Sequence, residues 1–174
     1  MSKPALVVID PQNDYFPDGA FPLWNTEGTL GVIEKAIAAA QAKGIPVVLV
    51  QHVADASKGI APFFNPGTEG VALHARVSAI APNAPVVVKH FADSFEGTTL
   101  HDTLRGLGAD TLILCGMMTQ NCVTHTALSR RADDYRGVTV LTDASTTVTE
   151  MLHRIALSAL STRVTLASVE QALG

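Results

Sequence analysis

Short apolar runs alternate with helical stretches along the whole chain, and this alternation limits the possible folds more than any other feature. The first run, residues 5–10, reads Ala-Leu-Val-Val-Ile-Asp and is apolar up to a terminal acid. Such a run is typical of a strand that is buried on both faces of a parallel sheet. Similar runs recur at residues 46–51, 85–89, 111–115 and 138–142, and more weakly at 163–167.

Helical patterns fill the intervals between these runs. They cover residues 29–43, 98–107, 122–134 and 149–160, with a last one from about residue 168. Gly44 and Gly108 stand where helix C-caps are expected, just ahead of a new strand. We therefore predict a single α/β domain over residues 1–174, a three-layer α/β/α sandwich around a mainly parallel, Rossmann-like sheet of about six strands.

The segment 53–82 departs from this alternation, because it is too long and too rich in turn residues for a plain crossover. We interpret it as a surface excursion. Its Phe63-Phe64 pair is consistent with core packing, with a lid over its own or a neighbour's site, or with an intersubunit contact.

Composition and charge argue against several classes of function. The net charge of −4 and the lack of a basic run disfavour a nucleic-acid partner. No apolar stretch reaches the roughly 18 residues of a membrane span. The first residues lead directly into a strand, without room for a signal peptide, and the two cysteines do not form a disulfide framework. We expect a cytoplasmic protein. Its mean hydropathy of +0.26 is compatible with a homo-oligomer.

Three of the predicted strands lead to reactive side chains, namely Asp10, Lys89 and Cys122. In open parallel sheets, ligands bind beyond the carboxyl ends of the strands, so the three groups are expected at one edge. Cys122 stands at what should be the first turn of a helix, where the helix dipole favours a nucleophilic thiolate. Each residue also has a plainer interpretation. Asp10 could cap a turn, Lys89 could extend into solvent, and Cys122 could be a small core residue.

Three motifs, in order, resemble the isochorismatase-like cysteine hydrolases, which include nicotinamidases, N-carbamoylsarcosine amidase and ureidoacrylate-type amidohydrolases. Residues 7–16, Val-Val-Ile-Asp-Pro-Gln-Asn-Asp-Tyr-Phe, are similar to the family's D-x-Q-N-D-F motif. Residues 89–100, Lys-His-Phe-Ala-Asp-Ser-Phe-Glu-Gly-Thr-Thr-Leu, resemble its K-x(4–5)-F-x-G-T-x-L segment. Residues 115–123, Cys-Gly-Met-Met-Thr-Gln-Asn-Cys-Val, resemble its G-x-x-T-x-x-C-V nucleophile turn.

The resemblance implies a role for each matching residue. Cys122 would be the nucleophile, Asp10 the general base, and Lys89 the group that stabilises the thiolate. The family also places a cis peptide at the position of the Met117–Met118 bond. The N–H groups of Met118 and Cys122 would form the oxyanion hole. Together these features imply hydrolysis of a C–N bond in a small amide or ureido substrate through a thioester, without a cofactor.

The chain departs from the metal-binding members of that superfamily. Nicotinamidase-type relatives bind a metal through a D-W-H-P-x-x-H-like stretch, whereas residues 51–55 read Gln-His-Val-Ala-Asp and hold a single histidine. A catalytic zinc site normally has three protein ligands, so we expect no metal. We interpret His52 as a pocket residue or a strand cap.

Other chemistries are alternatives to the implied one. True isochorismatases cleave a vinyl ether and carry a non-nucleophilic residue in place of the cysteine, so Cys122 favours acyl chemistry. A Cys–His dyad with His125 or His90 is a further possibility, although i, i+3 neighbours on a helix seldom present a base correctly. Cys115, inside a strand, is most simply a core residue.

The substrate pocket is expected among the loops at the active edge, where aromatic side chains can sandwich a small planar molecule. The candidate substrate-binding residues are Phe16, Phe21, Trp24, His52, Phe64, Phe95, Thr119 and Asn121. A catalytically idle ligand-binding or assembly member of the same fold is an alternative. A nucleotide-binding fold is disfavoured, because the turn after the first strand lacks G-x-G-x-x-G.

Overall fold

The computed structural model describes residues 2–174 and contains one six-stranded sheet in the order β3-β2-β1-β4-β5-β6. All neighbouring strands are parallel. The predicted fold class is therefore confirmed. The connection from β3 to β4 crosses the sheet, so the chain reverses its direction of growth at the β1–β4 boundary. The strands are β1 (Pro4–Ile9), β2 (Val47–His52), β3 (Val86–Lys89), β4 (Thr111–Met117), β5 (Val138–Thr146) and β6 (Thr165–Ala167).

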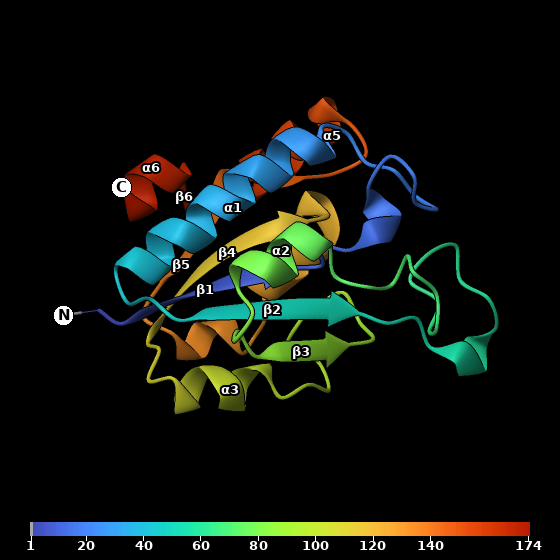
Figure 1. The fold of residues 1–174 in the computed structure, drawn as a ribbon. Helices are drawn as coiled ribbons and strands as arrows, with labels where there is room; N and C mark the ends of the chain where they lie inside the picture. Colours follow the sequence, from blue (N-terminus) through green and yellow to red (C-terminus); the bar gives the residue numbers. More distant parts are fainter. Residues whose placement is uncertain (1) are drawn as a thin grey trace.

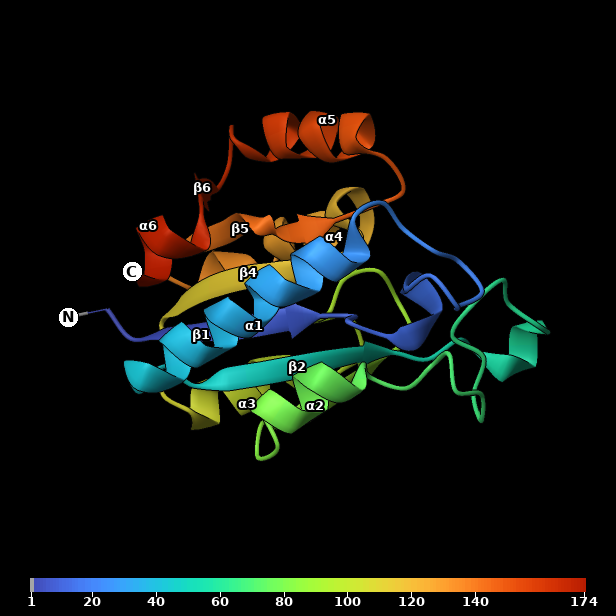
Figure 2. The same cartoon turned by 45° about the horizontal axis from the view of Figure 1, so that its top comes forward.

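Helices cover the sheet on both sides (Figures 1 and 2). Buried side chains of α1, α2 and α6 belong to one core cluster, and buried side chains of α3, α4 and α5 belong to the other. None of these helices, within residues 2–174, is long and apolar enough to cross a membrane. The helices are α1 (Thr26–Ala42), α2 (Ala75–Ile80), α3 (Leu100–Gly106), α4 (Thr124–Ala127), α5 (Glu150–Leu160) and α6 (Val169–Leu173).

The central strand β1 shows why the apolar runs predicted a doubly covered sheet. Its Leu6 and Val8 belong to one core cluster, while Val7 and Ile9 belong to the other, and all four side chains are fully buried. Alternate residues of a strand point to opposite faces, so a continuous apolar run fills both cores. Each such side chain contributes about 1.5–3 kcal/mol through its burial.

The excursion folds back over the chain's own β1–α1 loop, beyond the carboxyl end of β2 (Figure 1). The Phe64 N–H donates to Asp14 Oδ2 at 2.6 Å, and Gln12 forms an antiparallel bridge with Leu73. Phe64 is 1% exposed and packs edge-on against Tyr15, with ring centroids 4.6 Å apart. Core packing within the same chain is thus the correct interpretation for Phe64. The excursion also contains α2, which its turn-rich sequence did not predict.

The helix predicted over residues 122–134 is wrong. The chain forms a π-helical turn at Thr119–Val123, then the short α4, then a 3-10 turn at Ala132–Asp134. The Ser129 side chain accepts a hydrogen bond from the Arg131 N–H at 3.2 Å. Such side-chain bonds compete with the helical pattern. Cys122 therefore lies in a π-helical turn rather than at the N-terminus of a long α-helix.

Candidate active site

Asp10, Lys89 and Cys122 meet in a closed site beyond the ends of β1, β3 and β4. Lys89 Nζ lies 2.9 Å from Asp10 Oδ2 and donates to Cys122 Sγ at 3.1 Å. Asp10 and Lys89 are 0% exposed, and Cys122 is 1% exposed. The arrangement brings a thiol, a carboxylate and an ammonium together, and these are groups that covalent catalysis by a cysteine can use.

Two backbone features bring the acid and the cysteine together. Asp10 has a left-handed φ of 51°, a conformation that aspartate tolerates better than most residues, and its N–H donates to Val50 O at 3.0 Å. Gly116, near the end of β4, has a φ of 120°, and a Cβ there would lie 2.0 Å from Ile9 O. Only glycine permits this approach of β4 to β1, and the approach places the nucleophile turn beside Asp10.

The Lys89 ammonium has a complete set of hydrogen bonds. It contacts His52 Nδ1 at 2.9 Å and Phe91 O at 3.0 Å, in addition to Cys122 Sγ. Neither oxygen of Asp10 has a hydrogen-bond partner within residues 2–174, so the 2.9 Å contact with Lys89 is an ion pair without hydrogen-bond alignment. The carboxylate is therefore free to accept a proton.

The site combines a charged lysine with a neutral thiol. Burial lowers the pKa of Lys89, but the effects of Asp10 and Cys122 together outweigh it, so that the pKa is raised. Burial and then the charge of Asp10 raise the pKa of the Cys122 thiol to about 12, although Lys89 opposes this. The sequence-based expectation of a thiolate favoured by a helix dipole is not met in the closed site. A thiolate arises there only if its proton moves to a neighbouring base.

His52 is the fourth polar member of the site and was predicted as a pocket residue or a strand cap. Its backbone N–H donates to Gln12 Oε1 and its carbonyl accepts from Gln12 Nε2, both at 2.7 Å. Burial, followed by the charge of Lys89, lowers the pKa of His52 to about 4. The imidazole is therefore neutral near pH 7.

Asp10, His52 and Cys122 each offer one ligand atom, and the three atoms lie within 4.8 Å of one another. The Lys89 ammonium is within 3.1 Å of all three, and a metal ion would have to displace it or tolerate its charge. The residues present therefore do not fit a metal centre.

Treatment with a metal chelator is accordingly expected to leave any catalytic activity unchanged. Activity before and after incubation with excess EDTA and dialysis measures this directly. Loss of most of the activity, with recovery on addition of a divalent ion, would contradict the conclusion that Lys89, rather than a metal ion, is the cation of this site.

Comparison with known proteins identifies the family. A sequence model of the Isochorismatase domain matches residues 4–171. The chain belongs to the isochorismatase family. Its relatives include the uncharacterized family protein YddQ of Bacillus subtilis strain 168, 39% identical over 83% of this chain and 78% of YddQ. Another is maleamate amidohydrolase of Pseudomonas putida KT2440, 33% identical over 79% of this chain and 70% of that protein.

The fold of this isochorismatase family member is also found in solved structures. The crystal structure of an isochorismatase family protein from Desulfovibrio vulgaris Hildenborough superposes with a TM-score of 0.87. That protein is 28% identical, and the match covers 98% of this chain and 96% of the other.

An aromatic cluster lies beside the polar residues of the candidate active site. The Tyr15 ring contacts Phe63 and Phe64 at 5.3 and 4.6 Å between centroids, and His52 lies 5.9 Å from Phe64. The predicted pocket residue Phe21 joins it, 4.9 Å from Phe63. Burial, and then the charges of Asp10 and Cys122, raise the pKa of Tyr15. The sequence analysis did not name Tyr15 as a neighbour of the site, although its position in the first motif, five residues after Asp10, indicates that it lies nearby.

The other predicted pocket residues have different surroundings. The rings of Phe16 and His74 pack at a tilt, with centroids 4.4 Å apart, and Trp24 is partly exposed, 6.1 Å from His153. Thr119 Oγ1 forms a buried hydrogen bond with His153 Nδ1 at 2.9 Å. Phe16 thus packs against the residue that precedes α2, while Trp24 and Thr119 pack against α5. The predicted contacts of these three residues with substrate stay predictions.

Asn121 and His125 form a local pair on the nucleophile turn. The Asn121 carbonyl accepts from His125 Nδ1 at 2.8 Å. The His125 side chain is exposed, and its Nδ1 is occupied by this bond, so the geometry gives no support to a Cys122–His125 dyad. His90 is likewise exposed and bonds Val53 O at 2.7 Å. Cys115 is fully buried in the core, as expected.

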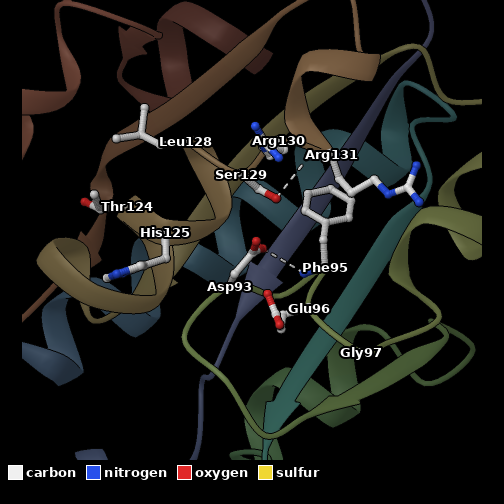
Figure 3. A pocket seen from close by; sticks show the side chains of 10 residues that line it. All are labelled: Asp93, Phe95, Glu96, Gly97, Thr124, His125, Leu128, Ser129, Arg130 and Arg131. Atoms are coloured by element: carbon white, nitrogen blue, oxygen red, sulfur yellow. Dashed lines mark hydrogen bonds between the residues drawn. The ribbon is translucent and has the colours of Figure 1, made fainter.

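Phe95 lines a separate pocket of about 650 Å³ (Figure 3). Asp93, Phe95, Glu96 and Gly97 come from the loop after β3, and the other labelled residues come from α4 and the turn that follows it. None of Asp10, Lys89 and Cys122 lines this pocket. The Phe95 ring also packs against Tyr135, with centroids 6.0 Å apart.

Proposed function

We propose that this chain is a cysteine hydrolase that cleaves a C–N bond in a small amide or ureido compound through a thioester on Cys122. One observation carries the proposal. In a buried site, the Lys89 ammonium contacts both the Cys122 sulfur, at 3.1 Å, and Asp10 Oδ2, at 2.9 Å. A buried thiol next to a carboxylate with free oxygens and a fixed cation is suited to acyl transfer.

In the first half of the cycle, Asp10 accepts the proton of the Cys122 thiol and the sulfur attacks the acyl carbon of the substrate. The Lys89 ammonium stabilises the thiolate as it forms, because this buried cation loses little of its field to solvent. The C–N bond then breaks, Asp10 returns the proton to the departing nitrogen, and ammonia or an amine leaves. The acyl group remains on sulfur as a thioester.

In the second half, water attacks the thioester carbon and Asp10 takes one of its protons. The carbon–sulfur bond breaks, the carboxylic acid leaves, and the proton passes from Asp10 to the Cys122 sulfur. The net reaction is amide plus water to acid plus amine, so the cycle needs neither a redox partner nor a cofactor.

Backbone N–H groups are the proposed partners of the oxyanion in both tetrahedral intermediates. The Met118 N–H donates to no acceptor within residues 2–174, and Met118 is only 7% exposed. The Met117–Met118 peptide bond before it is cis. The N–H groups of Met118 and Cys122 would together donate two hydrogen bonds to the oxyanion, and each would lower the barrier by about 3 kcal/mol.

The substrate class is inferred from the relatives and from the aromatic cluster beside the site. The relative named maleamate amidohydrolase hydrolyses an amide, which favours small amides as the first compounds to test. Tyr15, Phe21, Phe63 and Phe64 form an apolar cluster, and the ring of Phe64 lies 5.9 Å from that of His52 between centroids. Apolar side chains next to a few polar groups are typical of sites for small molecules.

A panel of small amides and ureido compounds tests the proposal, with release of ammonia or amine as the measurement. The expected result is turnover of at least one compound, with a covalent adduct on Cys122 detected by mass spectrometry after acid quench. Turnover without any adduct, or cleavage of a vinyl ether alone, would contradict the thioester mechanism. Absence of both turnover and adducts would favour a catalytically idle member of the family.

The homo-oligomer and the cytoplasmic location expected from the sequence stay predictions. Two apolar side chains on α5 are exposed, Met151 by 73% and Ile155 by 59%. They are compatible with a contact between copies of the chain. Light scattering at micromolar concentration is expected to give a dimer or a larger assembly, and a monomeric mass would contradict that expectation.

A further inference from the structure

The donors of Lys89 and the acceptors around it match in number. An ammonium group has three N–H donors. The structure gives it three hydrogen-bond acceptors, His52 Nδ1, Phe91 O and Cys122 Sγ, at 2.9, 3.0 and 3.1 Å. Asp10 Oδ2 is as near as the closest of these, yet it accepts no hydrogen bond. Three acceptors besides its ionic partner therefore hold the ammonium in place.

His52 reaches this position because of sheet register. It is paired with Lys89 across β2 and β3, so the two side chains project from neighbouring strands at the same level. Gln12 fixes the end of β2 through both backbone groups of His52. Since Lys89 is protonated, the bond requires Nδ1 to be the acceptor and the remaining ring proton to be on Nε2.

We propose that His52 is a positioning residue that holds the Lys89 ammonium against the Cys122 sulfur by accepting one of its N–H groups. Without this acceptor, the ammonium would keep two of its three hydrogen bonds, and the Asp10 carboxylate, 2.9 Å away, would draw it from the sulfur. A longer contact between the ammonium and the sulfur would stabilise the Cys122 thiolate less. The fraction of Cys122 present as thiolate would then fall. This inference rests on the proposed roles of Asp10 and Cys122.

Two substitutions separate the acceptor from the bulk of the ring. His52→Leu keeps an apolar side chain against Phe64 but removes Nδ1, whereas in His52→Asn the side-chain carbonyl oxygen can take the place of Nδ1. The measurement is the rate of alkylation of Cys122 by iodoacetamide at about pH 7, mapped by mass spectrometry. His90→Leu is the matched control, because His90 is exposed and bonds only a backbone carbonyl.

His52→Leu is expected to slow alkylation of Cys122 about tenfold, the size of one charge-assisted hydrogen bond. His52→Asn is expected to stay within about threefold of the wild-type rate on the same basis, and His90→Leu to match the wild type. Labelling of the buried Cys115 reports any general loosening of the fold, and it should stay negligible in all variants. A wild-type rate in His52→Leu, or equal losses in the leucine and asparagine variants, would overturn the proposal.

The readout needs no substrate, so it can fail independently of the proposed function. If the leucine variant is slow and the asparagine variant is not, the role of His52 stands even if no amide is hydrolysed. If amides are hydrolysed but the two variants behave alike, the hydrolase assignment stands and the role of His52 is wrong.

Discussion

Replacing Cys122 by alanine is expected to abolish hydrolysis while the protein stays folded. The sulfur is the only group in the proposed cycle that forms a covalent bond with the substrate. Its loss should lower kcat by about 10⁴-fold or more, because the remaining residues supply binding and electrostatics without a nucleophile. The side chain is small and 1% exposed, so alanine fits the same space and removes a buried thiol of high pKa. Hydrolysis of the first active compound of the panel is the measurement.

Cys115→Ala is the matched control. Cys115 is also a fully buried cysteine, but it belongs to the core within β4. We expect wild-type turnover with a loss of about 1 kcal/mol of stability from the small cavity. If Cys122→Ala kept more than a few per cent of the wild-type rate, the covalent mechanism would be wrong.

Lys89→Met is expected to destabilise the fold by about 3–5 kcal/mol at neutral pH. Methionine fills a similar volume but leaves the Asp10 carboxylate buried at 0% exposure without its ionic partner. A buried charge without compensation is among the most costly changes that a single substitution can make. Urea denaturation followed by circular dichroism measures the free energy of unfolding.

The double variant Asp10→Asn/Lys89→Met separates the charge from the packing. It removes both partners, so its stability is expected to return to within about 1 kcal/mol of the wild type, while activity stays lost. A double variant that is less stable than Lys89→Met would show that shape, rather than the uncompensated charge, dominates the site.

Much of the fold followed from the sequence, because the strands are buried on both faces. Continuous apolar runs such as that of β1 have no other common explanation, and all six predicted strands are present. The meeting of Asp10 and Lys89 also followed, since polar residues at the carboxyl ends of parallel strands share an edge. Ser168 was placed at the start of the last helix, where it forms a capping box with Gln171.

Other features could not be predicted from the sequence. The early end of α4 coincides with a local bond from the Arg131 N–H to the Ser129 side chain, and no residue pattern indicates the π-helical turn at Cys122. The contact between His52 and Lys89 depends on the β2–β3 register, which no residue pattern in a continuous apolar run specifies. The direction of the thiol pKa shift depends on how completely the site is buried, and here burial and Asp10 outweigh the lysine.

The pH dependence of Cys122 alkylation tests the central claim most directly, because it asks where the thiol proton goes. With a pKa of about 12, a thiol that lost its proton to solvent would react about tenfold faster for each unit of rising pH. A thiol that passes its proton to Asp10 supplies thiolate without exchanging protons with solvent. We therefore expect an alkylation rate that changes less than about threefold between about pH 6 and about pH 8, with glutathione as the free-thiol standard. A rate that rises about tenfold per unit, in parallel with glutathione, would contradict Asp10 as the base.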